Sequence, residues 1–143
     1  MYLVSSCLAG INCRYDGKNN LNKKVADLVK AGKAIPVCPE VLGGLPIPRD
    51  PSEIIVDEDG NKRVVTEKGK DLTVEFKLGA EKTLQIAKIL EAKKAILQQR
   101  SPSCGSGKIY DGSFSGNLVS GRGLTAELLI AEGIEVLTEA DLE

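Results

Sequence analysis

The sequence contains no histidine and no tryptophan among its 143 residues. Without histidine, the chain cannot form a Ser-His-Asp triad, a Cys-His dyad or a Cys2His2 zinc site, and no imidazole is present to move protons. Acid–base chemistry must therefore use carboxylates, hydroxyls, lysines or bound water.

The sequence also lacks an excess of charge of either sign, because 19 basic residues balance 20 acidic ones. This balance predicts no electrostatic attraction to nucleic acid or to a membrane surface. The apolar opening, MYLVSS, has no positively charged segment and is too short for a signal peptide or a membrane span. We therefore expect a cytoplasmic protein with neither a nucleic-acid nor a membrane partner.

The length and the four cysteines narrow the class of protein further. A chain of 143 residues can bury one core but is short for two, which predicts a single domain over residues 1–143. The cytosol keeps thiols reduced, so the cysteines are better interpreted as metal ligands or reactive thiols than as disulfides.

Short β-rich runs alternate with amphipathic helical patterns along the chain. The apolar runs predict strands at residues 2–6, 34–38, 93–99 and 134–139. Apolar residues spaced by three and four predict helices from Leu21 to Gly32, from Asp71 to Leu90 and over residues 123–133. Alternating strands and helices imply right-handed crossovers and a mostly parallel sheet. The predicted fold is a three-layer, Rossmann-like α/β domain.

The remaining segments are predicted to lie outside this alternation. Two β-branched runs flank Asp59 and Gly60, which is a hairpin signal, so we expect a projecting β-hairpin over residues 53–67. Three prolines in residues 46–51 and the many glycines and serines in residues 101–116 predict loops.

Three cysteines follow predicted strands. Cys7 and Cys38 come at the ends of the first two strands, and Cys104 lies a few residues beyond the third. Because the carboxyl ends of parallel strands share one edge of a sheet, where ligand crevices form, we expect these thiols to converge. The alternative is that they are three small, buried apolar residues.

Cys13 lies six residues after Cys7, in a predicted loop. It is a fourth ligand, a redox partner or an incidental thiol, and its spacing does not decide among these. A structural zinc site would use four sulfurs, whereas a reactive centre needs an open position.

Polar residues beside the cysteines are candidates for proton transfer. Glu40 follows Cys38 by two residues, which brings its carboxylate to the same site unless it caps the following turn or pairs with a lysine. Ser101 and Ser103 precede Cys104, where they either donate hydrogen bonds to a ligand or hold the loop in a turn. Arg14 and Arg49 lie on predicted loops and could hold a planar substrate through their forked donors.

The tripeptide Tyr-Asp-Gly occurs twice, at residues 15–17 and 110–112. Its composition is typical of turns, and the repetition alone predicts nothing more.

Four segments together resemble a family of short bacterial proteins, long classed as a domain of unknown function, that includes the thiouracil desulfidases. They are SSCLAGINCRYDGK, PVCPEVLGGLPIPRDPSE, VVTEKGKDLTVEFKLGA and AILQQRSPSCGSGKIYDGSFSG. The resemblance spans nearly the whole chain, and the combination of PVCPEVLGG with SPSCGS is its most specific part.

The resemblance implies a four-iron four-sulfur cluster held by three cysteines, which match Cys7, Cys38 and Cys104. It implies a non-redox desulfuration in which the iron without a protein ligand binds the sulfur of a thiolated pyrimidine such as thiouracil, giving uracil and sulfide. The family's proton-transfer groups match Glu40 and either Ser101 or Ser103.

Two other hypotheses remain open at this stage. The chain could be a zinc or iron–sulfur module whose metal is structural or sensory and uses all four cysteines. It could also be a metal-free sulfur carrier, which requires a cysteine of low pKa.

Overall fold

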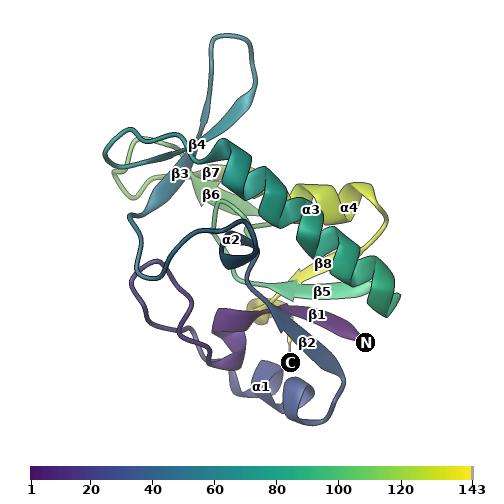
Figure 1. Ribbon diagram of the computed structural model, residues 1–143. Helices are drawn as coiled ribbons and strands as arrows, with labels where there is room; N and C mark the ends of the chain where they lie inside the picture. Colours follow the sequence, from purple (N-terminus) through teal and green to yellow (C-terminus); the bar gives the residue numbers. More distant parts are fainter. Residues whose placement is uncertain (143) are drawn as a thin grey trace.

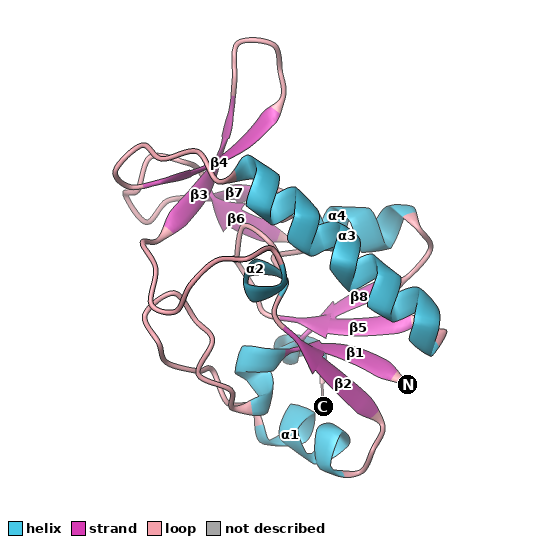
Figure 2. Ribbon diagram, in the orientation of Figure 1, coloured by secondary structure: helices cyan, strands magenta, loops and turns pink. Residues whose placement is uncertain are grey.

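A computed structural model describes residues 1–142. Figures 1 and 2 show a sheet covered by helices, with two smaller antiparallel hairpins beside it. The strands are β1 (Tyr2–Ser5), β2 (Ala34–Val37), β3 (Ser52–Val56), β4 (Lys62–Thr66), β5 (Lys94–Leu97), β6 (Lys108–Tyr110), β7 (Leu118–Ser120) and β8 (Glu135–Thr138). The helices are η1 (Ser6–Ala9), α1 (Lys23–Lys30), α2 (Pro39–Leu42), α3 (Thr73–Leu90), α4 (Leu124–Ala131) and η2 (Glu139–Asp141), where η marks a 3-10 helix.

The central sheet confirms the predicted α/β class. Its strand order is β2-β1-β5-β8, and all its pairings are parallel. The chain leaves β1 toward β2 on one side and then crosses to β5 and β8 on the other. The switch point lies between β1 and β5, which is where ligand crevices form in open sheets of this kind.

Alternating residues of the central strands face two different helical layers. Leu3 and Leu97 pack in the cluster that includes residues of α3 and α4, whereas Val4 and Ile96 pack with Val25 of α1. Successive side chains of a strand point to opposite faces, so this alternation requires both faces to be covered. The three-layer prediction is therefore confirmed.

The edge position of β2 explains how its proline is tolerated. Pro36 lies opposite Val4 of β1, and β2 is the outermost strand on its side of the sheet. A residue without a backbone N–H fits an edge strand, because no further strand needs that donor.

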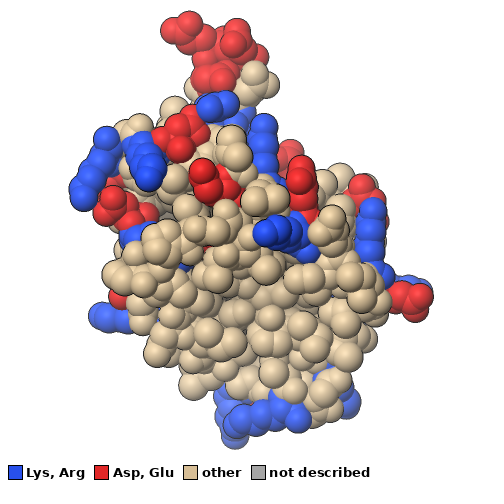
Figure 3. Space-filling model, in the orientation of Figure 1, with Lys and Arg blue, Asp and Glu red and all other residues tan. Residues whose placement is uncertain are grey.

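The predicted hairpin over residues 53–67 is confirmed as β3 and β4, which project from the molecule in Figure 1. Gly60 adopts a φ of 82° in its turn. Acidic side chains gather at the hairpin tip in Figure 3, whereas much of the face below it carries no charged side chain.

Two predictions about elements need correction. The first helix begins at Lys23, not Leu21, because the Asn22 side chain accepts a hydrogen bond from Val25 N and caps it. Leu21 lies outside the helix and is 62% exposed.

The segment 101–116 is not a loop throughout. It contains β6, which pairs with β7 as a second antiparallel hairpin. Each strand has only three residues, and β7 is mostly exposed, so neither shows the apolar alternation that marks a strand in sequence. The short helix α2 was also not predicted.

A close helix contact fixes the position of α2. A Cβ at Gly43 would collide with the carbonyl oxygen of Glu75, and a Cβ at Gly79 would collide with that of Pro39. The two glycines let the backbones of α2 and α3 touch. This contact holds α2, which follows β2 in the chain, at the carboxyl edge of the sheet.

No helix within residues 1–142 has the length and hydropathy needed to cross a membrane.

Candidate active site

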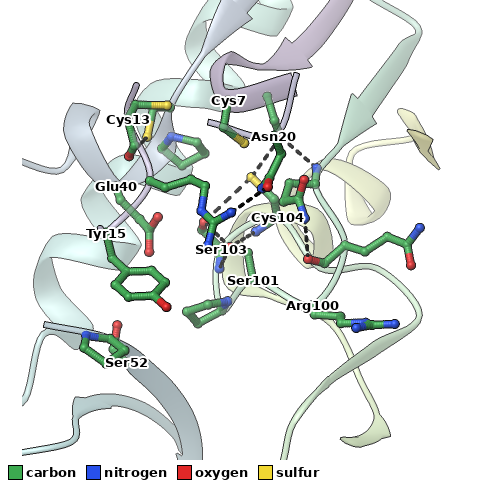
Figure 4. Close-up of a pocket in the computed structure, with 18 of the residues that line it drawn as sticks. Cys7, Cys13, Tyr15, Asn20, Glu40, Ser52, Arg100, Ser101, Ser103 and Cys104 are labelled. Carbon is green, nitrogen blue, oxygen red and sulfur yellow. Dashed lines mark hydrogen bonds between the residues drawn. The ribbon is translucent and has the colours of Figure 1, made fainter. Parts of the chain in front are cut away.

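A cavity of about 490 Å³ lies beside the carboxyl ends of β1, β2 and β5 (Figure 4). All four cysteines line it, together with the three residues predicted to transfer protons: Cys7, Cys13, Cys38, Cys104, Glu40, Ser101 and Ser103. The structure therefore brings together residues that are far apart in sequence, as the parallel topology predicts.

Cys7 is positioned by the turn that ends β1. It lies in η1, is 8% exposed, and is followed by Gly10 at a φ of 97°. Asn20 N donates to the Cys7 carbonyl at 2.9 Å, which folds the loop of residues 11–22 back over this turn. Cys13 is carried into the cavity on that loop.

Cys38 is the N-cap residue of α2, and Pro39 is the first residue of the helix. Proline suits this position because the first helical N–H has no intrahelical partner. Glu40 then lies in the first turn, so the short helix places the thiol and the carboxylate on the same wall of the cavity.

Glu40 forms a buried ion pair with Arg49. The Arg49 guanidinium donates to Glu40 Oε2 at 2.8 Å and to the Cys13 carbonyl at 3.0 Å. The Glu40 side chain is only 17% exposed and the Arg49 side chain only 6%. Burial raises the pKa of Glu40 above its usual value, although the guanidinium opposes that shift.

Cys104 lies at the end of a tight turn whose hydrogen bonds come from Ser101. The Ser101 hydroxyl oxygen accepts from the backbone N–H groups of Ser103 and Cys104 at 3.0 and 3.1 Å. The turn rests on α4, because Thr125 N and Ala126 N both donate to the Ser103 carbonyl. A Cβ at Gly123 would lie 2.5 Å from that carbonyl, so this approach requires glycine.

Two hydroxyls contact the Cys104 sulfur. Ser5 Oγ donates to Cys104 Sγ at 3.3 Å while accepting from Gln98 N at 2.9 Å. Ser103 Oγ donates to the same sulfur at 3.7 Å. Burial raises the pKa of the Cys104 thiol to about 12, and these two hydrogen bonds oppose the shift. Ser5 was not singled out from the sequence, because only the pairing of β1 with β5 brings it to Cys104.

Cys13 is close to Cys38 in the cavity, because Cys38 Sγ donates to the Cys13 carbonyl at 3.9 Å. Its hydrogen bond with Cys38 lowers the pKa of Cys13, but a hydrogen bond with Cys7 and burial outweigh that effect and raise it to about 11. The Cys13 contact and burial raise the pKa of Cys38 as well. A sulfur carrier needs a thiol of low pKa, so the raised pKa values of these thiols do not favour that hypothesis.

The donor set suits a polynuclear iron–sulfur cluster. Thiolates are the protein ligands that such clusters take, and four cysteines line this cavity. Within the described residues, no three His, Cys, Asp or Glu side chains are arranged to hold a single metal ion. A cluster spans several ångströms, so its ligands need not converge on one point. Thiols of raised pKa would lose their protons when metal binds.

Both arginines that the sequence suggested as substrate-binding residues form hydrogen bonds and ion pairs with other residues of the protein. Arg14 donates to Asn20 Oδ1 at 2.7 Å and pairs with Asp16 at 3.1 Å, which stabilises the loop that carries Cys13. Arg49 holds Glu40. Sequence reasoning identified both residues but not these partners.

Three aromatic residues of the cavity were not predicted as site residues: Tyr15, Tyr110 and Phe114. The two tyrosines belong to the repeated Tyr-Asp-Gly tripeptides. In the sequence the repetition indicates turns alone, although each copy lies shortly after a cysteine, Tyr15 after Cys13 and Tyr110 after Cys104.

Comparisons with known proteins find a relative similar in sequence and a solved structure similar in fold. An uncharacterized protein of Bacillus subtilis (strain 168), YbbK, is 48% identical over 147 residues, covering 99% of this chain and 97% of that protein. The solved structure of TudS, a [4Fe-4S]-dependent thiouracil desulfidase, is 43% identical and superimposes with a TM-score of 0.89. That match covers 99% of this chain and 91% of TudS.

The family model described as 2-thiouracil desulfurase matches residues 2–141, which is nearly the whole of the chain. The resemblance seen in the sequence is thereby confirmed, and this chain belongs to the 2-thiouracil desulfurase family.

Proposed function

We propose that this protein is a cluster-dependent enzyme that removes sulfur from a thiolated pyrimidine such as thiouracil, releasing uracil and sulfide. The observation that carries the proposal is the shared cavity, in which thiols from three separate loops face the Glu40 carboxylate and the serines before Cys104. Membership of the family and the 43% identity to TudS support it.

Cys7, Cys38 and Cys104 are the proposed ligands of a four-iron four-sulfur cluster. Each lies beyond the carboxyl end of a different parallel strand, so the sheet brings the three segments to one edge. When bound, the cluster would supply a Lewis acid for the substrate sulfur through the iron that has no cysteine. The hydroxyls of Ser5 and Ser103 would then donate to a ligating sulfur, and such contacts tune a metal centre.

The reaction is a hydrolysis with no transfer of electrons. The oxygen of a water molecule bonds to the thiocarbonyl carbon and the carbon–sulfur bond breaks. The base keeps the oxygen as its new carbonyl, and both water hydrogens leave with the sulfur as hydrogen sulfide. Glu40 is the proposed base that takes a proton from this water. Arg49 holds its carboxylate in place, and its raised pKa brings it closer to the range in which a carboxyl group both accepts and releases protons.

Ser101 and Ser103 are proposed to have different roles in the reaction. Ser101 is partly exposed, and its hydroxyl lies 2.8 Å from Ser103 Oγ, so it links the open part of the cavity to the buried Ser103. Ser103 is 1% exposed and contacts the Cys104 sulfur. We assign proton delivery to Ser101 and positioning to Ser103, so Ser101→Ala should lower kcat more than Ser103→Ala does.

Sulfide release tests the proposed function directly. The protein is loaded with iron and sulfide without oxygen, mixed with 2-thiouracil or 4-thiouracil, and assayed for sulfide and uracil. We expect equal amounts of the two products. The proposal is wrong if a fully loaded sample releases no sulfide from any of several thio-bases.

A second function is favoured by the position of Cys13, which lines the same cavity as the other three cysteines and whose carbonyl accepts from Cys38 Sγ at 3.9 Å. If all four sulfurs bind metal, the protein is a structural or sensory metal module with no open position. Metal analysis separates the two functions. The enzyme requires about four iron and four sulfide per chain, whereas one zinc per chain would indicate the module.

A further inference from the structure

Aromatic residues are scarce in this chain, which has three tyrosines, two phenylalanines and no tryptophan. Three of these five residues nevertheless line the cavity of the four cysteines: Tyr15, Tyr110 and Phe114. Phe76 belongs to the buried core at 1% exposure, and Tyr2 begins β1. Most of the aromatic residues are therefore placed around one cavity.

We propose that Tyr15, Tyr110 and Phe114 form an aromatic wall that binds the flat heterocyclic ring of the substrate by stacking. This inference rests on the proposed function, because it names the groups that would recognise the base in the same cavity. Aromatic side chains stack on nucleobases regardless of the substituents on the ring, so the wall would select a planar heteroaromatic thiocarbonyl over an aliphatic one.

The two Tyr-Asp-Gly tripeptides hold their tyrosines in the same way. Asp16 Oδ1 accepts from Lys18 N at 3.0 Å, and Asp111 Oδ1 accepts from Ser113 N at 2.9 Å. In each copy the glycine has a positive φ, 77° at Gly17 and 91° at Gly112. Each copy is thus an Asx turn that fixes the course of the chain directly after a tyrosine of the cavity.

Phe114 is held at the cavity by a contact between the two hairpins. Glu53 Oε1, on β3, accepts from Gly112 N at 2.9 Å and from Phe114 N at 3.2 Å. Phe114 has a φ of 56°, which is unfavourable for a bulky residue and persists only where the surroundings impose it. Glu53 supplies that constraint, so the backbone that carries the ring is fixed before any ligand arrives.

Tyr15 keeps accessible surface for a ligand. The Arg14 guanidinium carbon lies over its ring at 5.8 Å from the centroid, which restrains the ring through a cation–π contact. The residue is still 43% exposed. Its backbone is also fixed, because Arg49 N donates to the Tyr15 carbonyl at 2.8 Å. A restrained ring with free surface binds a flat ligand at little entropic cost.

The test uses cluster-loaded protein and two readouts, the steady-state constants for 2-thiouracil and the Kd of uracil by calorimetry. Replacing Tyr15 by Leu should raise both KM and the uracil Kd by about tenfold, with a much smaller change in kcat. Replacing Tyr15 by Phe keeps the ring and should recover most of the affinity. Tyr2→Leu is the matched control outside the cavity and should behave as the wild type.

The inference is overturned if Tyr15→Leu and Phe114→Leu both retain wild-type KM and uracil Kd at unchanged iron content. Failure of the proposed function looks different. In that case the wild-type enzyme releases no sulfide, while the uracil titration of wild type and variants still decides whether the aromatic wall binds the base.

Discussion

The Glu40–Arg49 pair is the most buried pair of opposite charges that the structure describes at the cavity. Removing a buried carboxylate leaves its guanidinium uncompensated, so a truncation would combine a chemical effect with destabilisation. A neutral side chain of the same shape separates the two effects, because it can still accept the hydrogen bond from Arg49.

Replacing Glu40 by Gln should therefore keep the cluster and lose the chemistry. We expect iron content and visible absorption close to the wild type and a fall in sulfide release of about a hundredfold or more, because a general base contributes that much. Sulfide assays on anaerobically loaded samples measure the change. Glu67 lines the same cavity without a described partner, so Glu67→Gln is the matched control. A Glu40→Gln variant with the wild-type rate would exclude Glu40 as the base.

Cys13 and Cys38 are the informative pair for cluster ligation, since they line the same cavity and Cys38 Sγ contacts the Cys13 carbonyl. With three ligands as proposed, Cys13→Ser should retain about four iron per chain and Cys38→Ser should lose most of it. Iron and sulfide analysis after gel filtration measures both variants. Equal loss of iron in the two would instead indicate a site closed by four sulfurs.

At the scale of single residues, the sequence predicted which residues line the cavity better than it predicted the contacts among them. Cys7, Cys38 and Cys104 follow from strand ends, and Glu40 and the serines follow from their places beside these cysteines and from motif resemblance, whereas the part of Cys13 was left open. The hydrogen bond from Ser5 to Cys104 joins residues 99 positions apart, and no local pattern encodes it. The roles of Cys7, Cys38 and Cys104 as ligands remain predictions.

At the scale of elements, the contact between α2 and α3 controls where Cys38 and Glu40 lie. Both residues belong to the short segment that Gly43 and Gly79 allow to lie against α3. A four-residue helix cannot be stable alone, so its position depends on this packing.

Replacing Gly79 by Ala should therefore destabilise the protein and displace the site. Alanine favours a helix over glycine by about 1 kcal/mol, but its Cβ would meet the Pro39 carbonyl. We expect a net loss of about 1–3 kcal/mol in the free energy of unfolding, together with poorer cluster loading. Denaturant titration measures the first effect and iron analysis the second.

Gly107→Ala is the control for this experiment, because a Cβ there has no neighbour within 4 Å and the residue has no positive φ. It should change the free energy of unfolding by less than about 0.5 kcal/mol. If Gly79→Ala were as stable as Gly107→Ala, close backbone packing would not be what positions α2.

The helices and strands that the sequence predicted correctly are those with a clear repeat of apolar residues or with a turn sequence between two β-rich runs. The β3–β4 hairpin and α3 belong to this group, because β-branched runs flank Gly60 and an apolar stripe follows Leu72. The β6–β7 hairpin and α2 do not. They are too short for a period to show, and tertiary contacts form them.

At the scale of the whole molecule, the parallel sheet accounts for the site. Three strand ends that share one edge bring together the segments that carry Cys7, Cys38 and Cys104, and the crevice lies at the switch point between β1 and β5. Single-domain organisation and a cytoplasmic location stay predictions from the sequence.

The central claim is that this edge of the sheet holds a four-iron cluster on three cysteines. Anaerobic iron and acid-labile sulfide analysis, combined with the absorption spectrum of the same sample, tests it most directly. The account predicts about four iron and four sulfide per chain and a broad visible absorption band from the same sample. A stoichiometry of one zinc per chain, or a loaded sample with no labile sulfide, would contradict it.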